Sequence, residues 1–162
     1  MCSGSRIKEA GFTLMELIIV IVVVGVLSAY AMMRNSSSSV FSLLSQAQTM
    51  ASDIRHAQAL ATVWGKRLRV DADGTNSVYA VSCVTSGVSP CDVSPVINPA
   101  TGEEFRVALK KGVVLTGPAQ LEISSLGQPM VATTQTYVLK AEDNTVNLNV
   151  GALTGHVTVV TP

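Results

Sequence analysis

The sequence is poor in charged and aromatic side chains. Charged residues make up 14% of the 162 residues, against a usual share of about 25%, and aromatic residues only 4%. Eleven basic and eleven acidic residues cancel, so no net field attracts nucleic acid or another polyanion. Three cysteines are too few for a small fold held together by disulfides. The sequence has no P-loop, dinucleotide-binding, G-x-S-x-G or metal-ligand motif, so we expect neither an enzyme nor a bound cofactor or metal.

Apolar residues are abundant instead, and they are concentrated near the N-terminus. Residues 12–33 hold 18 apolar side chains out of 22 and a single charge, that of Glu16. A helix of this length is roughly 33 Å long, close to the hydrocarbon thickness of a bilayer. The short segment before it carries Arg6 and Lys8, and basic residues favour the cytoplasmic side. The sequence therefore predicts a membrane-spanning helix over residues 12–34, with the rest of the chain exported.

Two interpretations of this N-terminal block compete. In one, it is a secretory signal with an A-x-A cleavage site at residues 29–31, and a soluble domain is released. In the other, the chain is cut between Gly11 and Phe12, so that residues 1–11 are a leader and the apolar helix stays on the mature protein. The Glu16 carboxylate favours the second, because a charge costs about 2.5–3.5 kcal/mol at mid-bilayer and a signal peptide has no use for it.

The run Gly11-Phe12-Thr13-Leu14-Met15-Glu16, followed by uninterrupted apolar residues, resembles the N-terminus of type IV prepilins and type II secretion pseudopilins. The resemblance implies that a prepilin peptidase cuts after Gly11 and methylates the new N-terminal Phe12. It also implies that Glu16 acts in assembly. One position departs from the family, since Met33 stands where many members have the proline that kinks this helix.

The spacing of Phe12 and Glu16 indicates how assembly could be controlled. The new amine and the carboxylate are four residues apart, one helical turn, so they can pair within one chain. In a filament, Glu16 of an incoming subunit could instead pair with the Phe12 amine of its neighbour. An unpaired charge among apolar helices is costly, so such pairing would fix the register between subunits. Both alternatives remain open at the level of sequence.

Beyond the apolar run, the pattern changes twice. Residues 35–65 have apolar side chains at spacings of three and four, which predicts an amphipathic helix that ends at Gly65. Residues 66–162 show a period of two, rich in valine and divided by turn residues, which predicts eight short strands. The expected strands are 67–71, 77–84, 104–109, 113–116, 120–124, 135–141, 145–150 and 156–160. The predicted fold is α+β, with a long hydrophobic and amphipathic helix packed on an antiparallel meander.

This layout resembles the GspH/FimT-type minor subunits of the pilin family, including those of the mannose-sensitive haemagglutinin pilus. The features shared with them are a Ser125-Leu126-Gly127 turn and a closing Gly155-His156-Val157 strand. The resemblance implies a structural, minor subunit of a type IV pilus, with a type II secretion pseudopilin or a DNA-uptake subunit as alternatives. Implied partners are other pilin subunits, prepilin peptidase, the inner-membrane assembly machinery and membrane lipid. The implied location is a single pass of the bacterial inner membrane with a periplasmic head, then an extracellular pilus or a periplasmic pseudopilus.

Two smaller features have candidate roles. Cys83 and Cys91 bound a nine-residue segment, and in an oxidising periplasm we expect them to form a disulfide. Lys66, Arg67 and Arg69 form a small basic cluster that could contact phosphates. Asp71 continues the same strand face with the opposite charge, so an internally paired face is expected and DNA binding is not.

Overall fold

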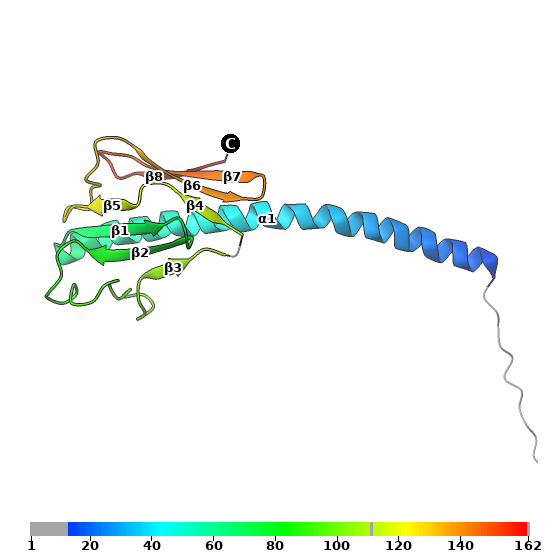
Figure 1. Cartoon of the computed structure of the whole chain (residues 1–162), viewed down its shortest axis with the longest axis horizontal. Helices are drawn as coiled ribbons and strands as arrows, with labels where there is room; N and C mark the ends of the chain where they lie inside the picture. The colour runs from blue at the N-terminus through cyan, green and yellow to red at the C-terminus, as the bar shows by residue number, and fades with distance from the viewer. Residues whose placement is uncertain (1–12, 111, 162) are drawn as a thin grey trace, which may run out of the picture. The chain divides into compact units, whose positions relative to one another are not determined.

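The computed structural model describes residues 13–110 and 112–161, except for the side chains of residues 31–39. The chain divides into two compact units, Met1–Ser38 and Ser39–Pro162. Helix α1 (Leu14–Trp64) contributes its first part to one unit and its second part to the other (Figure 1). Gly11 and Phe12, and with them the predicted cleavage point, lie outside the described residues.

In the second unit, α1 buries the face that its sequence period predicts. Its buried apolar side chains are Leu43, Ala47, Met50, Ala51, Ile54, Ala57, Leu60 and Ala61. Gly65, with a φ of 62°, ends the helix in the left-handed conformation. The Lys66 N–H then donates to the Ala61 carbonyl over 3.2 Å. This terminal motif needs a residue without a Cβ at its left-handed position, which Gly65 supplies.

Eight antiparallel strands follow α1 in the described part of the chain. They are β1 (Leu68–Asp73), β2 (Val78–Cys83), β3 (Arg106–Ala108), β4 (Val114–Thr116), β5 (Gln120–Ile123), β6 (Gln135–Ala141), β7 (Asn144–Val150) and β8 (Val157–Val160). The predicted fold class, a long N-terminal helix packed on antiparallel β-structure, is confirmed. All eight strands lie where the period of two indicates them.

The pairing of these strands differs from the predicted meander. The strands form two four-stranded sheets, in the orders β3-β2-β1-β5 and β4-β6-β7-β8. Strand β5 leaves its neighbour β4 and returns to β1, with Val70 opposite Leu121. The β4–β5 connection passes Gly117, where an added Cβ would lie 2.7 Å from Tyr137 Cδ1. Local periodicity reports which residues are extended, not which distant strand they meet, so the exchange between sheets could not be read from the sequence.

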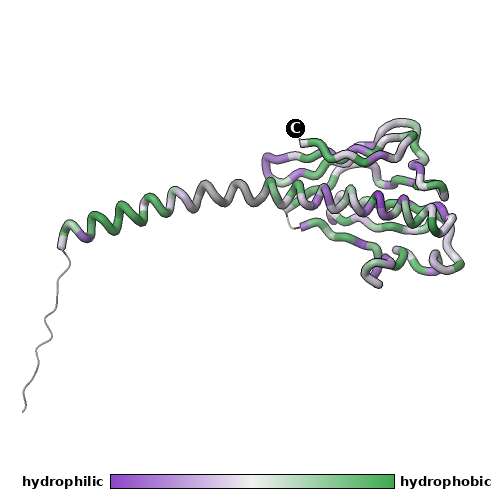
Figure 2. Tube along the Cα trace, turned by 180° about the vertical axis from the view of Figure 1, so that it is seen from behind, coloured by the Kyte–Doolittle hydropathy of each residue, from purple (hydrophilic) through white to green (hydrophobic). Residues whose placement is uncertain are grey.

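A single apolar cluster joins α1 to the inner faces of both sheets. Its largest fully buried members include Leu43, Met50 and Ile54 from the helix and Tyr79, Phe105 and Tyr137 from the β-region. Figure 2 shows this second part of α1 with alternating hydrophobic and hydrophilic residues. Among the described residues, every member of the cluster lies at or beyond Leu43. The head therefore builds its core without the first unit.

Two polar side chains of α1 reach the sheet that contains β2 and β3. The carboxylate of Asp53 accepts a hydrogen bond from the Tyr79 hydroxyl over 2.6 Å. Gln46, only 8% exposed, accepts from the Lys110 N–H over 2.6 Å through its side-chain oxygen. The bonds provide partners for two buried side chains, Tyr79 of β2 and Gln46 of the helix. Both fix how the helix lies on this sheet.

Two further side chains of α1 bind the start of β8 and the turn before it, and the turn after β5 lies close to the helix backbone. Arg55 donates to the Val157 carbonyl over 2.7 Å, and Gln58 donates to the Gly155 carbonyl over 2.9 Å. Gly127, with a φ of 78°, lies so close to the helix that a Cβ would be 3.1 Å from the Gln58 carbonyl oxygen. Both glycines that carry the sequence resemblance thus lie where the β-region touches α1.

The two buried tyrosines of the head differ in their partners. The Tyr79 hydroxyl is bonded to Asp53, whereas the buried Tyr137 hydroxyl has no hydrogen-bond partner among the described residues. Burial raises the pKa of both phenols, and the nearby carboxylates of Asp53 and Asp71 add to the shift at Tyr79 and Tyr137 respectively. Both phenols are therefore neutral at physiological pH. Each hydroxyl is a buried donor that needs a hydrogen-bond acceptor.

Replacing each tyrosine by phenylalanine distinguishes the hydrogen-bonded hydroxyl of Tyr79 from the unpaired hydroxyl of Tyr137. Tyr79→Phe leaves the Asp53 carboxylate without its donor, and we expect it to lower the free energy of unfolding by about 1.5 kcal/mol. Tyr137→Phe removes an unpaired buried hydroxyl, so stability should be unchanged or higher by up to about 1 kcal/mol. Urea unfolding followed by fluorescence of Trp64, the only tryptophan, measures both. Equal losses in the two variants would contradict the assignment.

Candidate assembly helix and head surface

The first part of α1 exposes apolar side chains on all sides. Every large apolar residue over residues 14–30 has between 44% and 75% of its surface exposed. Figure 2 shows the same stretch as a nearly continuous hydrophobic segment. A helix that is apolar all round is covered in its working state by lipid or by other protein. Among the residues whose side chains are described, no helix contains an apolar stretch long enough to cross a membrane.

Glu16 lies in the first turn of α1, and its side chain is exposed. Its N–H donates to the Thr13 side-chain oxygen over 3.3 Å and to the Thr13 carbonyl over 3.0 Å. Thr13 thus caps the helix, and a carboxylate three residues later suits the positive end of the helix dipole. This cap was not among the features expected from the sequence, although the Thr13-x-x-Glu16 spacing is that of a capping box. Pairing of Glu16 with the Phe12 amine stays a prediction, because Phe12 lies outside the described residues.

The two cysteines of the head lie at the end of β2 and in the loop that follows it. The structure joins Cys83 to Cys91, with their Cα atoms 5.6 Å apart. Cys91 is buried, and Val88 between the two cysteines is 71% exposed. The crosslink ties the loop to the end of β2. It therefore restricts the conformations of the segment between the two cysteines.

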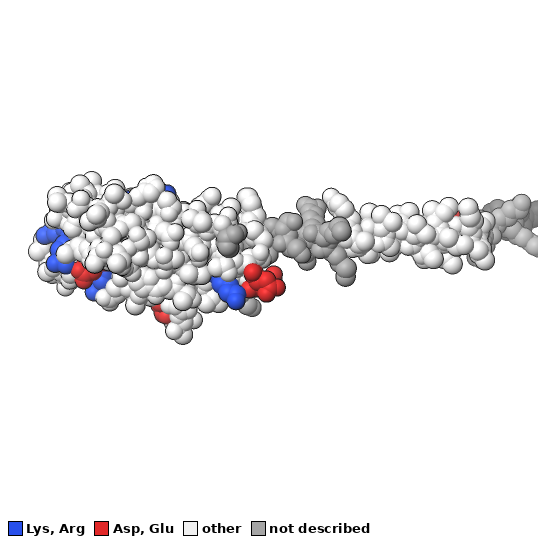
Figure 3. Space-filling model, turned by 90° about the horizontal axis from the view of Figure 1, so that it is seen from above, with Lys and Arg blue, Asp and Glu red and all other residues white. Residues whose placement is uncertain are grey.

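The three residues of the basic cluster at the start of β1 have different surroundings in the structure. Arg67 pairs with Glu122 of β5, and Arg69 lies 2.6 Å from Asp71 on its own strand. Opposite charges also alternate across the strands, since Arg69 stands directly opposite Glu122. The face of the head drawn in Figure 3 accordingly shows basic and acidic side chains in mixed groups. Two of the three candidate phosphate contacts are therefore already neutralised by carboxylates.

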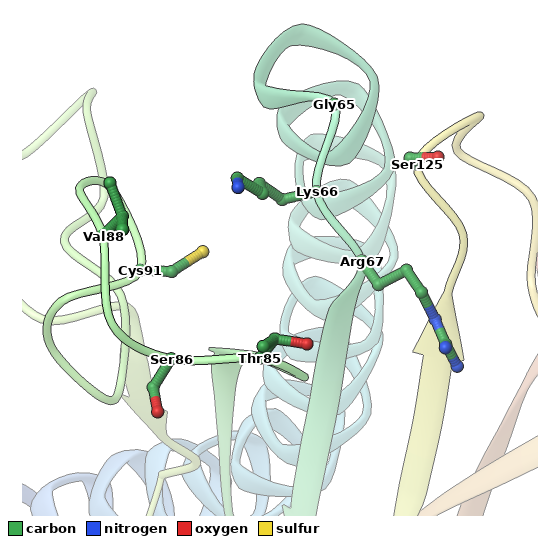
Figure 4. A pocket seen from close by; sticks show the side chains of 8 residues that line it. All are labelled: Gly65, Lys66, Arg67, Thr85, Ser86, Val88, Cys91 and Ser125. Atoms are coloured by element: carbon green, nitrogen blue, oxygen red, sulfur yellow. The ribbon is translucent and has the colours of Figure 1, made fainter.

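The third cation, Lys66, enters a groove at the end of α1. The groove has a volume of about 440 Å³ and lies between the helix end, the disulfide-closed loop and the turn after β5. Figure 4 shows the Lys66 side chain extending into it, while Arg67 points away toward β5. Thr85, Ser86 and Ser125 add hydroxyl groups to its lining. These residues come from distant segments, so their placement along one groove was not predicted from the sequence.

The paired arginines predict weak interaction with nucleic acid. We expect no retardation of a double-stranded oligonucleotide by the full-length chain at about 50 mM salt, because a phosphate would have to displace Glu122 or Asp71. The measurement is a gel-shift titration. A shift that disappears in Arg67→Ala and Arg69→Ala, but persists in Lys140→Ala on the other sheet, would contradict this expectation.

Comparison with known proteins supports the sequence resemblance in the N-terminal segment of the chain. A family model, the prokaryotic N-terminal methylation motif, matches residues 6–32. No curated protein matches the sequence significantly.

Solved structures share the fold of the chain at low sequence identity. The minor pseudopilin EpsH from the Type 2 Secretion System of Vibrio cholerae has a TM-score of 0.52 and 15% identity, covering 72% of this chain and 94% of its own. The type IV minor pilin FimU of Pseudomonas aeruginosa has a TM-score of 0.54 and 10% identity, covering 77% and 90%. The chain therefore contains an N-terminal methylation motif and shares the fold of these two structures.

Proposed function

We propose that the chain is a structural, minor subunit of a type IV pilus that assembles through its N-terminal helix. The observation that carries the proposal is the contrast between the two units. The head closes its own core from Leu43 onward, while the helix over residues 14–30 exposes apolar side chains on every side. Such a surface needs lipid or neighbouring helices to cover it. Similarity to a minor pilin and a minor pseudopilin supports the same role.

In this proposal the segment 12–34 first anchors the subunit in the inner membrane, as a single pass with the head in the periplasm. A prepilin peptidase removes residues 1–11 and methylates Phe12. The inner-membrane assembly machinery then moves the subunit from lipid into a bundle of similar helices. Both environments are apolar, so little hydrophobic energy changes in the exchange and polar contacts gain weight in choosing the arrangement.

Glu16 is the polar group that can determine how the helices are arranged in the bundle. It is the only charged residue in the segment 12–33, and its side chain is exposed. Once neighbouring helices surround it, an unpaired carboxylate is costly, whereas pairing with the Phe12 amine of a neighbour removes the penalty. The register that joins these two groups is therefore selected. A pseudopilin of a type II secretion system would use the same helix in the same way, and is the alternative function.

The maturation step predicts a defined mass. The purified mature chain should begin at Phe12 and carry one additional methyl group, as measured by intact-protein mass spectrometry. Replacing Gly11 by a bulkier residue should leave the leader attached, because the peptidase is expected to cut after glycine. A mature chain that begins at Met32 would show instead that the apolar segment is a removed secretory signal.

If Glu16 selects the register between subunits, Glu16→Ala should impair assembly. Membrane insertion should be retained, because the substitution removes a charge from an apolar segment. Incorporation into filaments should fall about tenfold or more, since the neighbour's amine is left unpaired. Glu103→Ala, in an exposed loop of the head, is the matched control and should assemble normally. Quantification of the subunit in sheared filaments measures both, and equal incorporation would remove the register argument.

A further inference from the structure

The outer strands of the two sheets differ in how well their free edges are protected. The edge of β5 is covered by the chain that follows it, since the Met130 N–H donates to the Glu122 carbonyl over 2.8 Å. Strands β3 and β4 have only three residues, and β4 lies against the β1–β2 turn, where a Cβ added to Gly74 would be 2.9 Å from the Leu115 carbonyl oxygen. Strand β8 consists of valine and threonine, and no backbone segment of the described chain pairs with its outer edge. An uncharged, β-branched edge of this kind is a template for another strand.

The hydrogen bonds around β8 show which of its backbone groups point away from the sheet. The Gly151 N–H donates to the His156 carbonyl over 2.9 Å, and in an antiparallel pair the bonded residues alternate along the strand. Even-numbered residues of β8 therefore bond to β7, and odd-numbered residues point outward. The Val157 carbonyl agrees with this pattern, because it accepts from Arg55 of α1 over 2.7 Å. Val157 is only 1% exposed, so the edge is closed at this residue and open beyond it.

The open part of the edge, from Val159 to Thr161, is complementary to a second copy of itself. Both of these residues present an outward N–H and an outward carbonyl, so two antiparallel copies can place Val159 opposite Thr161 and exchange hydrogen bonds at both positions. Val160 then lies opposite Val160 of the second copy, in a non-hydrogen-bonded pair whose Cα atoms are about 4.5 Å apart. The Val160 side chain is 47% exposed, and this pair covers it. No charged residue lies in the segment to oppose the pairing.

A groove between α1 and β8 leaves room for the incoming strand. It has a volume of about 450 Å³, and it is lined by residues 156–159 and by three residues of the helix, Gln48, Ala51 and Arg55. The bond from Arg55 to the Val157 carbonyl blocks pairing toward the start of β8. The register centred on Val160 uses the open backbone groups and leaves this bond intact, so the helix defines where the pairing ends.

We propose that the head pairs with a second copy of itself through the edge of β8, with residues 159–161 of the two copies antiparallel. The β4-β6-β7-β8 sheets of the two copies then form one continuous sheet. This interaction goes beyond the proposed filament role, because it uses only residues of the head. Such a short edge buries far less than the roughly 800 Å² per partner of a stable interface, so the pairing is weak and reversible, with a Kd of about 0.1–1 mM.

Disulfide trapping of the head alone, residues 39–162, tests the pairing, because the core of the head closes without the first part of the helix. Val160→Cys places two thiols opposite each other, at a separation that a disulfide can bridge. Val114→Cys is the matched control, since Val114 is 51% exposed on the strand at the opposite edge of the same sheet. The Val160→Cys dimer should form at least about tenfold faster, because pairing holds the two thiols together. Non-reducing gel electrophoresis after addition of copper phenanthroline measures both rates, and Cys83 and Cys91 do not compete because they are already joined.

A second pair of variants tests the backbone hydrogen bonds. Thr161→Pro removes the N–H that donates to Val159 of the second copy, whereas Thr161→Ala keeps it. Thr161 follows the last residue of β8 and is exposed, so both variants should keep the fold, which urea unfolding followed by Trp64 fluorescence checks. In the Val160→Cys background, Thr161→Pro should slow trapping about tenfold, because each copy loses a hydrogen bond, and Thr161→Ala should leave the rate unchanged.

Two outcomes would overturn the proposal. Equal trapping rates for Val160→Cys and Val114→Cys would show random collision rather than pairing at β8. A trapping rate that Thr161→Pro leaves unchanged would show that the contact does not use the backbone of this edge. Neither outcome bears on the filament role, because the material lacks the assembly helix.

Discussion

The closure of the head core on α1 is the constraint on which the rest of the structure depends. Side chains at spacings of three and four, from Leu43 to Ala61, fill the space between the helix and the inner faces of both sheets. This packing uses the apolar surface of the head internally. The apolar side chains over residues 14–30 stay exposed. One chain thereby has a folded part with its own core and a helical part with exposed apolar side chains.

Polar contacts decide how the sheets lie on the helix. Asp53 and Gln46 bind one side of the β-region, and Arg55 and Gln58 bind the start of β8 and the loop before it. All four lie on α1 beside the buried stripe, and the buried one, Gln46, needs a partner within the protein. The apolar cluster provides most of the driving force, but it is not directional. These bonds give the packing its specific orientation.

Charged side chains on the surface of the head are also paired with one another. Arg67 and Arg69 read as a basic cluster in the sequence, yet the structure places a carboxylate beside each. Glu122 could not be matched to them beforehand, because it comes from a strand that crosses between sheets to pair with β1. That crossover places a carboxylate beside Arg67, whereas Arg69 is paired with Asp71 of its own strand. The partner of Arg67 is thus a property of the topology.

The sequence by itself determined the helix, the eight strands and the fold class, because the periods of 3.6 and two are local properties of the chain. It also indicated the methylation motif and the isolated charge of Glu16, which depend on residue order alone. Only the tertiary structure decided the division into two sheets, the pairing of Arg67 with Glu122 and the placement of Lys66, Thr85 and Ser125 along one groove. These features join residues that are far apart in the chain, and their contacts depend on packing against α1, which no local pattern records.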